Sequence, residues 1–196
     1  MSVQQFEQEV LKAHNVLRAE HGAAPLRLSS KLNQVAREWA QHLLAIKRME
    51  HRQNSGYGEN IYWSSGAKRT GADTVQSWYD EIKLYDWSRP AFRSGTGHFT
   101  QLVWKDSTEL GVGLATRGNE MYVVCNYNPP GNYANRFAAN VLPKSGQRQS
   151  QRQSQSELAT VQPNRLVTRS TNVSYDVSGY VQTFQHYELV QKHTKY

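Results

Sequence analysis

The sequence predicts an α/β fold in which amphipathic helices pack against a small antiparallel sheet. Three segments carry apolar residues at the spacing of one helical face, and three others are rich in the aromatic and β-branched residues that favour strands. Because helical and strand-like segments are interleaved along the chain, we expect them to form layers. The 196 residues, 38% of them hydrophobic, suffice for one domain with a hydrophobic core.

The first predicted helix starts at a capping box and ends at a glycine. Ser2 and Gln5 are three residues apart, so each side chain can bond to the other residue's backbone N–H. Gly22 supplies the stop signal. Between these signals one helical face carries Phe6, Val10, Ala13, His14 and Leu17.

Two further helices follow from the same periodicity. The second begins at the cap candidates Ser29 and Ser30, and the third opens at Asp73 or a neighbouring residue. The apolar stripe of the second helix comprises Leu32, Val35, Ala36, Trp39, Ala40, Leu43 and Leu44. The stripe of the third comprises Val75, Trp78, Tyr79 and Ile82.

The three strand-like segments are residues 57–63, 110–115 and 121–127. The first is rich in aromatic residues, and the other two flank the loop sequence TRGNE. Two such strands joined by a short loop containing glycine are typical of a hairpin. We therefore expect the second and third strands to pair antiparallel.

A change of composition after Pro143 marks the predicted end of the domain, which spans residues 1–143. Residues 144–196 begin with KSGQRQSQRQSQSE, a sequence without apolar periodicity. Such a Gln/Ser-rich segment buries too little apolar surface to offset the entropy of ordering, so we predict a mostly disordered, basic tail. Aromatic and β-branched residues return in residues 172–191, where a short strand or docking on a partner is the alternative.

Composition excludes several classes of protein. No apolar run approaches the roughly 20 residues of a membrane-spanning helix, and residues 1–10 lack the features of a signal peptide. Cys125 is the single cysteine, so no internal disulfide can form, and we expect a cytoplasmic protein.

The charge of the chain is basic, with a net +7. Seven basic and three acidic residues follow Pro143, which leaves +3 for the domain. This balance suits an anionic membrane surface. Aromatic residues are not interleaved with Lys and Arg as they are in proteins that bind single-stranded nucleic acid, so no nucleic-acid partner is expected.

Four polar residues stand out against apolar surroundings: His51, Glu59, Glu81 and His98. Glu59 is placed on the same strand face as Ile61, and Glu81 on a helical edge with Trp78 and Tyr85. Carboxylates beside apolar groups are costly unless paired, and the histidines could be their partners or could together bind a divalent ion. The spacing alone leaves two solvated glutamates and two unrelated histidines equally open.

Four short sequences resemble motifs of the superfamily of cysteine-rich secretory proteins, antigen 5 and pathogenesis-related proteins. GHFTQLVWKDS (97–107) and YVVCNYNPPGNY (122–133) are similar to its two signature motifs. HNVLR (14–18) and GENI (58–61) resemble its two shorter motifs, in the expected order. Chance agreement of four ordered motifs is negligible, and the resemblance covers about residues 3–143.

The resemblance implies a three-layer α/β/α sandwich with a cleft lined by two histidines and two glutamates, which correspond to His51, Glu59, Glu81 and His98. In this family the two histidines can take up zinc or another divalent cation. His51 and His98 are therefore the candidate metal ligands, and Glu59 and Glu81 the carboxylates that orient them. Two protein ligands are fewer than the three of catalytic zinc or the four of structural zinc, so we expect a weak site.

Without a signal peptide or disulfides, the chain resembles the intracellular branch typified by the Golgi-associated plant pathogenesis-related protein. This implies a peripheral protein of Golgi or other endomembranes that contacts anionic lipid and forms a homodimer or binds a protein partner. An extracellular location, as for most of the family, is the alternative. That branch carries a myristoylated Met-Gly, whereas Ser2 stands here, so membrane contact would rest on positive charge.

His14, Asn15 and Asn60 lie in the two shorter motifs and are interpreted as structural hydrogen bonders. His14 falls on the apolar face of the first helix, and Asn60 is expected to tie a strand to a loop. Cys125 lies in the apolar run YVVCNY without an identifiable base beside it, so we expect a buried, inert thiol.

Two functions remain open. The first is a non-enzymatic binding module that holds a lipid, a peptide segment or another protein. The second is a metal-dependent hydrolase or protease in which Glu59 or Glu81 activates a metal-bound water between His51 and His98. The chain contains neither H-E-x-x-H nor G-x-S-x-G, so the binding module is favoured.

Overall fold

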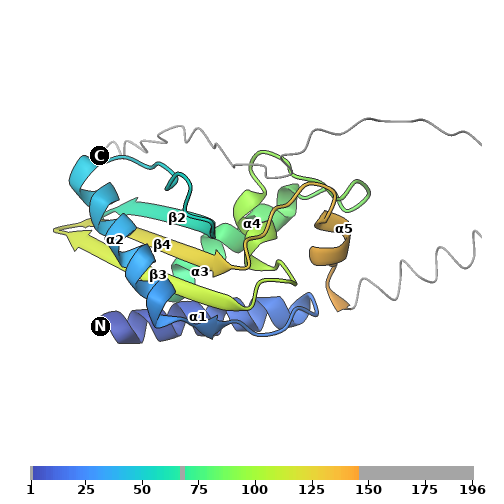
Figure 1. Cartoon of the computed structure of the whole chain (residues 1–196), viewed down its shortest axis with the longest axis horizontal. Helices are drawn as coiled ribbons and strands as arrows, with labels where there is room; N and C mark the ends of the chain where they lie inside the picture. The colour runs from blue at the N-terminus through green and yellow to red at the C-terminus, as the bar shows by residue number, and fades with distance from the viewer. Residues whose placement is uncertain (1, 67–68, 146–196) are drawn as a thin grey trace, which may run out of the picture.

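The computed structural model describes residues 2–66 and 69–145. These residues form three layers, with a four-stranded sheet in the middle (Figure 1). The strands are β1 (Arg27–Leu28), β2 (Gly58–Ser65), β3 (Glu109–Arg117) and β4 (Glu120–Asn128). The main helices are α1 (Val3–Glu20), α2 (Ser30–Ile46) and α3 (Gly71–Tyr79). Helix α2 crosses one face of the sheet, and α1 and α3 lie on the other, so the predicted α/β/α sandwich is confirmed (Figure 1).

Helix α1 begins and ends where its sequence signals predict. The Gln5 backbone N–H donates to Ser2 Oγ at 3.1 Å, and the Ser2 N–H donates to Gln5 Oε1 at 2.8 Å. At the other end Gly22 has φ 66°, a left-handed conformation that glycine adopts without steric cost.

The sheet has the order β1-β3-β4-β2. Strands β3 and β4 form the predicted antiparallel hairpin, and β2 pairs antiparallel with β4 at the edge of the sheet. Strand β1 pairs parallel with β3, and the sequence did not predict it. Two residues are too few to show a strand periodicity, which explains the omission.

The third predicted helix is shorter than its apolar stripe indicates. Thr70 is its N-cap, and Asp73 closes the capping box three residues later. Helix α3 ends at Tyr79, and a 3-10 helix, η1 (Asp80–Leu84), continues the chain. Glu81 therefore lies on η1 rather than on the α-helical edge expected for it, and a long loop then leads to α4 (Gly97–Leu102).

Two hydrophobic clusters hold the layers together, one on each face of the sheet. The cluster under α2 includes Ala36, Leu43, Ile61, Tyr122 and Val124. The cluster under α1 and α3 includes Val10, Trp78, Phe99, Val123 and Tyr127. Alternating residues of β4 enter opposite clusters, as the pleat of a strand requires.

Two glycines of β3 allow α2 to lie directly on the sheet. A Cβ atom at Gly111 would overlap the backbone of Leu32, and one at Gly113 would overlap the backbone of Ala36 and Arg37. The close contact of helix and sheet therefore depends on positions without side chains.

Replacing Gly113 by alanine is expected to lower the free energy of unfolding by about 1–3 kcal/mol, because α2 must move away from β3. Urea denaturation measures the change. Thr116→Ala at an exposed position of the same strand is the control, with an expected change below about 0.5 kcal/mol. Equal stability of the Gly113 variant and wild type would contradict the close packing.

The predicted boundary at Pro143 remains a prediction, since most of the tail lies outside the described residues. Residues 144 and 145 are described and contact α1: Lys144 Nζ lies 2.6 Å from Glu20 Oε2, and Ser145 Oγ donates to Glu20 O at 3.3 Å. Within the described part of the chain, no helix combines the length and apolarity needed to cross a membrane.

Candidate functional site

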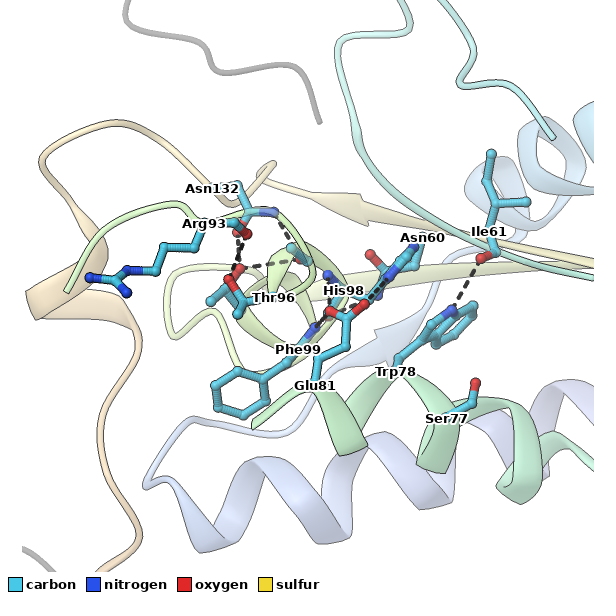
Figure 2. Close-up of polar contacts among 12 residues, drawn as sticks. Asn60, Ile61, Ser77, Trp78, Glu81, Arg93, Thr96, His98, Phe99 and Asn132 are labelled. Carbon is cyan, nitrogen blue, oxygen red and sulfur yellow. Dashed lines mark hydrogen bonds and ion pairs between the residues drawn. The ribbon is translucent and has the colours of Figure 1, made fainter. Parts of the chain in front are cut away.

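The four candidate residues form two histidine–glutamate pairs, called here the His/Glu site. In the first pair, His98 Nδ1 lies 2.6 Å from Glu81 Oε1. The backbone N–H groups of His98 and Phe99 donate to Glu81 Oε2 at 2.9 and 3.2 Å (Figure 2). Glu81 thus bonds three donors at the start of α4, and its position on η1 aims it at that turn.

The second pair lies between β2 and the loop that follows α2. His51 Nδ1 is 2.8 Å from Glu59 Oε1, which also accepts the Arg52 N–H at 3.1 Å. Glu59 Oε2 is within 3.5 Å of Asn126 Nδ2 on the neighbouring strand. The Glu59 side chain is 6% exposed and that of His51 25%, so the imidazole is the more accessible partner.

Two consecutive residues of the edge strand β2 contact the two histidines, one from each face of the strand. Glu59 faces the same side as Ile61, which belongs to the cluster under α2. Asn60 faces the other side and donates to the carbonyl oxygen of His98 at 3.0 Å. The motif GENI therefore holds both histidines, one through a carboxylate and one through an amide.

The fit of a divalent cation to this site depends on the ring nitrogens. Because Nδ1 of each imidazole contacts a carboxylate, a metal would bind through Nε2, and the carboxylates would fix the ring orientations. Among the residues that the structure describes, no three or more His, Cys, Asp or Glu side chains form a group able to hold a metal ion. Two imidazoles supply fewer ligands than the four of a closed zinc site, so a cation held by both would be completed by water.

His14 and Asn15 make buried or partly buried hydrogen bonds on α1. His14 Nδ1 bonds to the Val10 carbonyl oxygen at 2.8 Å, and burial lowers the pKa of His14 to about 4. Asn15 makes two hydrogen bonds to the backbone of Leu26, the residue before β1. Its Nδ2 donates to Leu26 O at 3.1 Å, and its Oδ1 accepts the Leu26 N–H at 2.8 Å.

Two residues that support the site were missed in the sequence. Arg18 is fully buried and donates to the carbonyl oxygens of Ala24, Leu102, Trp104 and Ser107 at 2.8–3.0 Å, while burial lowers its pKa to about 10. Its place four residues after His14, on the same helical face, was the available signal.

Trp78 is the other missed residue. Its ring stacks on that of His98 with centroids 6.2 Å apart and planes at 18°, and its Nε1–H donates to Ile61 O at 3.2 Å (Figure 2). The sequence placed Trp78 in the core stripe of the third helix, which is correct, but it did not indicate the contact with His98.

Cys125 is fully buried, and burial raises the pKa of its thiol well above the ordinary value.

The motif-bearing segments coincide with a known family model. Residues 11–127 match the model of the cysteine-rich secretory protein family. The matched range includes all four residues of the His/Glu site. The chain belongs to this family. The family assignment confirms the resemblance of the four motifs.

Curated relatives extend the comparison to named proteins. The family member is 43% identical over 145 residues to the human Golgi-associated plant pathogenesis-related protein 1, covering 71% of this chain and 94% of that protein. It is 38% identical over 133 residues to the pathogenesis-related protein 1A of Nicotiana tabacum, covering 66% of this chain and 79% of that protein.

Solved structures support the fold. The crystal structure of NaASP2 with Zn2+ matches with a TM-score of 0.59 at 24% identity, covering 74% of this chain and 88% of that one. At this level of identity the likeness concerns the fold alone, and it agrees with the three layers described above.

Proposed function

We propose that the protein is a non-enzymatic binding protein that works at an anionic membrane surface, with a His/Glu site that takes up a divalent cation weakly. The observation that carries the non-enzymatic part is the use of both carboxylates. Glu81 bonds three donors around the start of α4, and Glu59 bonds the His51 ring and the Arg52 N–H.

A hydrolase would need one of these carboxylates as a general base. A base must accept a proton from water within hydrogen-bond distance, and the same oxygens here hold imidazoles and backbone N–H groups in place. Two imidazoles are also one ligand short of a catalytic zinc site. Both features favour binding over hydrolysis.

The charge of the described surface supports the membrane part of the proposal. Every carboxylate of residues 2–66 and 69–145 has a hydrogen-bond or ion-pair partner within the domain. Exposed basic side chains include Lys12, Arg27, Lys31, Arg48, Arg69, Lys105 and Arg117. Basic residues close to an anionic surface contribute about 1 kcal/mol each.

The human relative is named Golgi-associated, which favours Golgi or other endomembranes as the place of action. A second copy of the chain or another protein is the alternative partner, and the same purified protein can be tested for both. Size-exclusion chromatography reports a homodimer independently of lipid.

Purified protein is expected to float with vesicles that contain phosphatidylserine and to remain behind with pure phosphatidylcholine vesicles. Binding should fall as salt rises, because screening shortens the Debye length to about 8 Å at physiological ionic strength. Equal binding to both kinds of vesicle, or binding indifferent to salt, would contradict the electrostatic proposal.

A matched pair of variants sharpens the vesicle experiment. Changing Lys12, Lys31 and Lys105 to glutamine removes three exposed charges and should weaken flotation. Changing the exposed Gln4 and Gln41 to alanine leaves the charge unchanged and should have no effect on flotation.

An activity assay tests the alternative function. Turnover of peptide or ester substrates by wild type, lost in Glu81→Gln, would support the hydrolase.

A further inference from the structure

A buried chain of hydrogen bonds connects α1 with the backbone of His98. His14 Nε2 lies 2.8 Å from the Tyr127 hydroxyl, and Asn60 Nδ2 lies 3.1 Å from the same oxygen. Asn60 Nδ2 also donates to the His98 carbonyl oxygen at 3.0 Å (Figure 2). His14 and Tyr127 are fully buried and Asn60 is 1% exposed, so bulk water cannot replace these partners.

The chemistry of these groups allows one arrangement of the protons. The Val10 carbonyl oxygen can only accept, so His14 Nδ1 carries the ring proton. Burial lowers the pKa of His14 to about 4, which keeps the ring neutral at pH 7 and makes Nε2 an acceptor. The Tyr127 hydroxyl must then donate to His14 and can accept from Asn60.

This arrangement fixes the amide of Asn60. Both neighbours of its Nδ2, the Tyr127 oxygen and the His98 carbonyl oxygen, are acceptors, so the amide must present its NH2 group to them. A rotated amide would place Oδ1 against the His98 carbonyl, with two unpaired oxygens in a buried space.

The hydrogen-bond chain from His14 ends at a peptide group whose N–H is bound by Glu81. The His98 carbonyl and the Phe99 N–H belong to one planar peptide group. Asn60 on β2 binds the carbonyl oxygen, and Glu81 on η1 accepts the N–H at 3.2 Å. Loss of either contact would allow this plane to tilt and carry the His98 ring with it.

We propose that Asn60 is a positioning residue for His98, and that His14 and Tyr127 act through it by fixing the direction of its amide. This proposal concerns the His/Glu site and rests on the proposed function in one respect. Only the zinc titration described below depends on cation binding. His51 differs in its exposure, because its side chain is 25% exposed whereas that of His98 is 7% exposed. His98 is thus the preorganised half of the site.

Amide hydrogen exchange in the full chain tests the positioning role directly. In Asn60→Ala the Phe99 amide should exchange about 10-fold faster than in wild type, the size expected for one lost buried hydrogen bond. The amide of Val123, a buried residue of β4, supplies the reference for global stability. A purely structural effect would accelerate both amides by the same factor.

Tyr127→Phe removes only the hydroxyl group and keeps the ring, so it remains informative if Asn60→Ala does not fold. It should accelerate Phe99 exchange by about 3-fold relative to Val123, since Asn60 keeps its bond to His98 but loses its fixed direction. Tyr122→Phe is the matched control: Tyr122 is a buried tyrosine of the same strand that faces α2. An equal ratio in the two tyrosine variants would overturn the proposal.

Zinc titration of the same variants separates this proposal from the proposed function. If wild type binds zinc, Asn60→Ala should weaken the affinity by about 3- to 10-fold and Tyr122→Phe should not change it. Faster Phe99 exchange in a protein that takes up no zinc would support positioning and contradict the cation site. Unchanged exchange and unchanged zinc affinity in Asn60→Ala would contradict positioning and leave the cation site intact.

Discussion

Zinc uptake by the protein is expected to be lost when either His51 or His98 is replaced by alanine. In the proposed site each imidazole would supply one Nε2 ligand, and a single imidazole with water is a poor site for zinc. Uptake by wild type should also weaken as the pH falls, since protons compete with the metal for the imidazole nitrogens. Calorimetric titration measures these affinities.

Variants of the carboxylates and of an unrelated histidine complete the zinc experiment. Glu59→Gln and Glu81→Gln should lower the affinity by about 10- to 100-fold, because in the proposed site the carboxylates would orient the rings without binding the metal. His42→Ala removes an exposed imidazole of α2, 3.8 Å from Glu50, and should have no effect. Equal affinity of His98→Ala and wild type would show that the paired histidines do not bind zinc together.

The parts of the fold that the sequence predicted are those with strong local signals. The capping box at Ser2, the stop at Gly22 and the hairpin of β3 and β4 depend on residues close together in the chain. Strand β1 and the 3-10 turns of η1 lack such signals. Their conformations depend on tertiary contacts, such as the parallel pairing of Arg27 with Glu109.

The candidate residues of the site were named from motifs, but their partners could not be. Nothing in the spacing of Glu81 and His98 indicates that one carboxylate binds a ring and two backbone N–H groups. That contact exists because α3 gives way to η1 at Asp80 and turns the carboxylate toward α4. The positions of the protons in the hydrogen bonds from His14 to Asn60 also cannot be predicted from the sequence. They follow from the neighbouring atoms, which determine the tautomer of the imidazole.

The buried position of Arg18 shows the same limit more sharply. A basic residue in an amphipathic helix is ordinarily solvated, and only the place of Arg18 on the helical face of His14 indicates burial. Its guanidinium instead donates to four backbone carbonyl groups, two of them in the segment after α4. Helix α1 therefore supports the site region twice, through Arg18 and through the hydrogen-bond chain of His14.

The free energy of unfolding is expected to fall by about 3 kcal/mol between pH 6.5 and pH 4 through His14 alone. Burial lowers the pKa of folded His14 from 6.5 to about 4, with Arg18 adding a smaller electrostatic effect in the same direction. Between these values the unfolded chain binds a proton that the folded protein does not. Stability is therefore complete above pH 6.5 and is lost progressively as the pH falls toward 4.

Urea denaturation of wild type and His14→Gln at several pH values isolates this contribution. Glutamine can occupy a similar space and form hydrogen bonds but does not titrate, so the two stability curves should converge as the pH falls from 6.5 to 4. Carboxylates such as Asp86, whose pKa its partners Ser88, Arg89 and Arg93 lower to about 2, titrate in both proteins and cancel in the difference. Parallel curves for wild type and variant would mean that folded His14 binds its proton at the ordinary pKa, and would contradict the pKa lowering by burial.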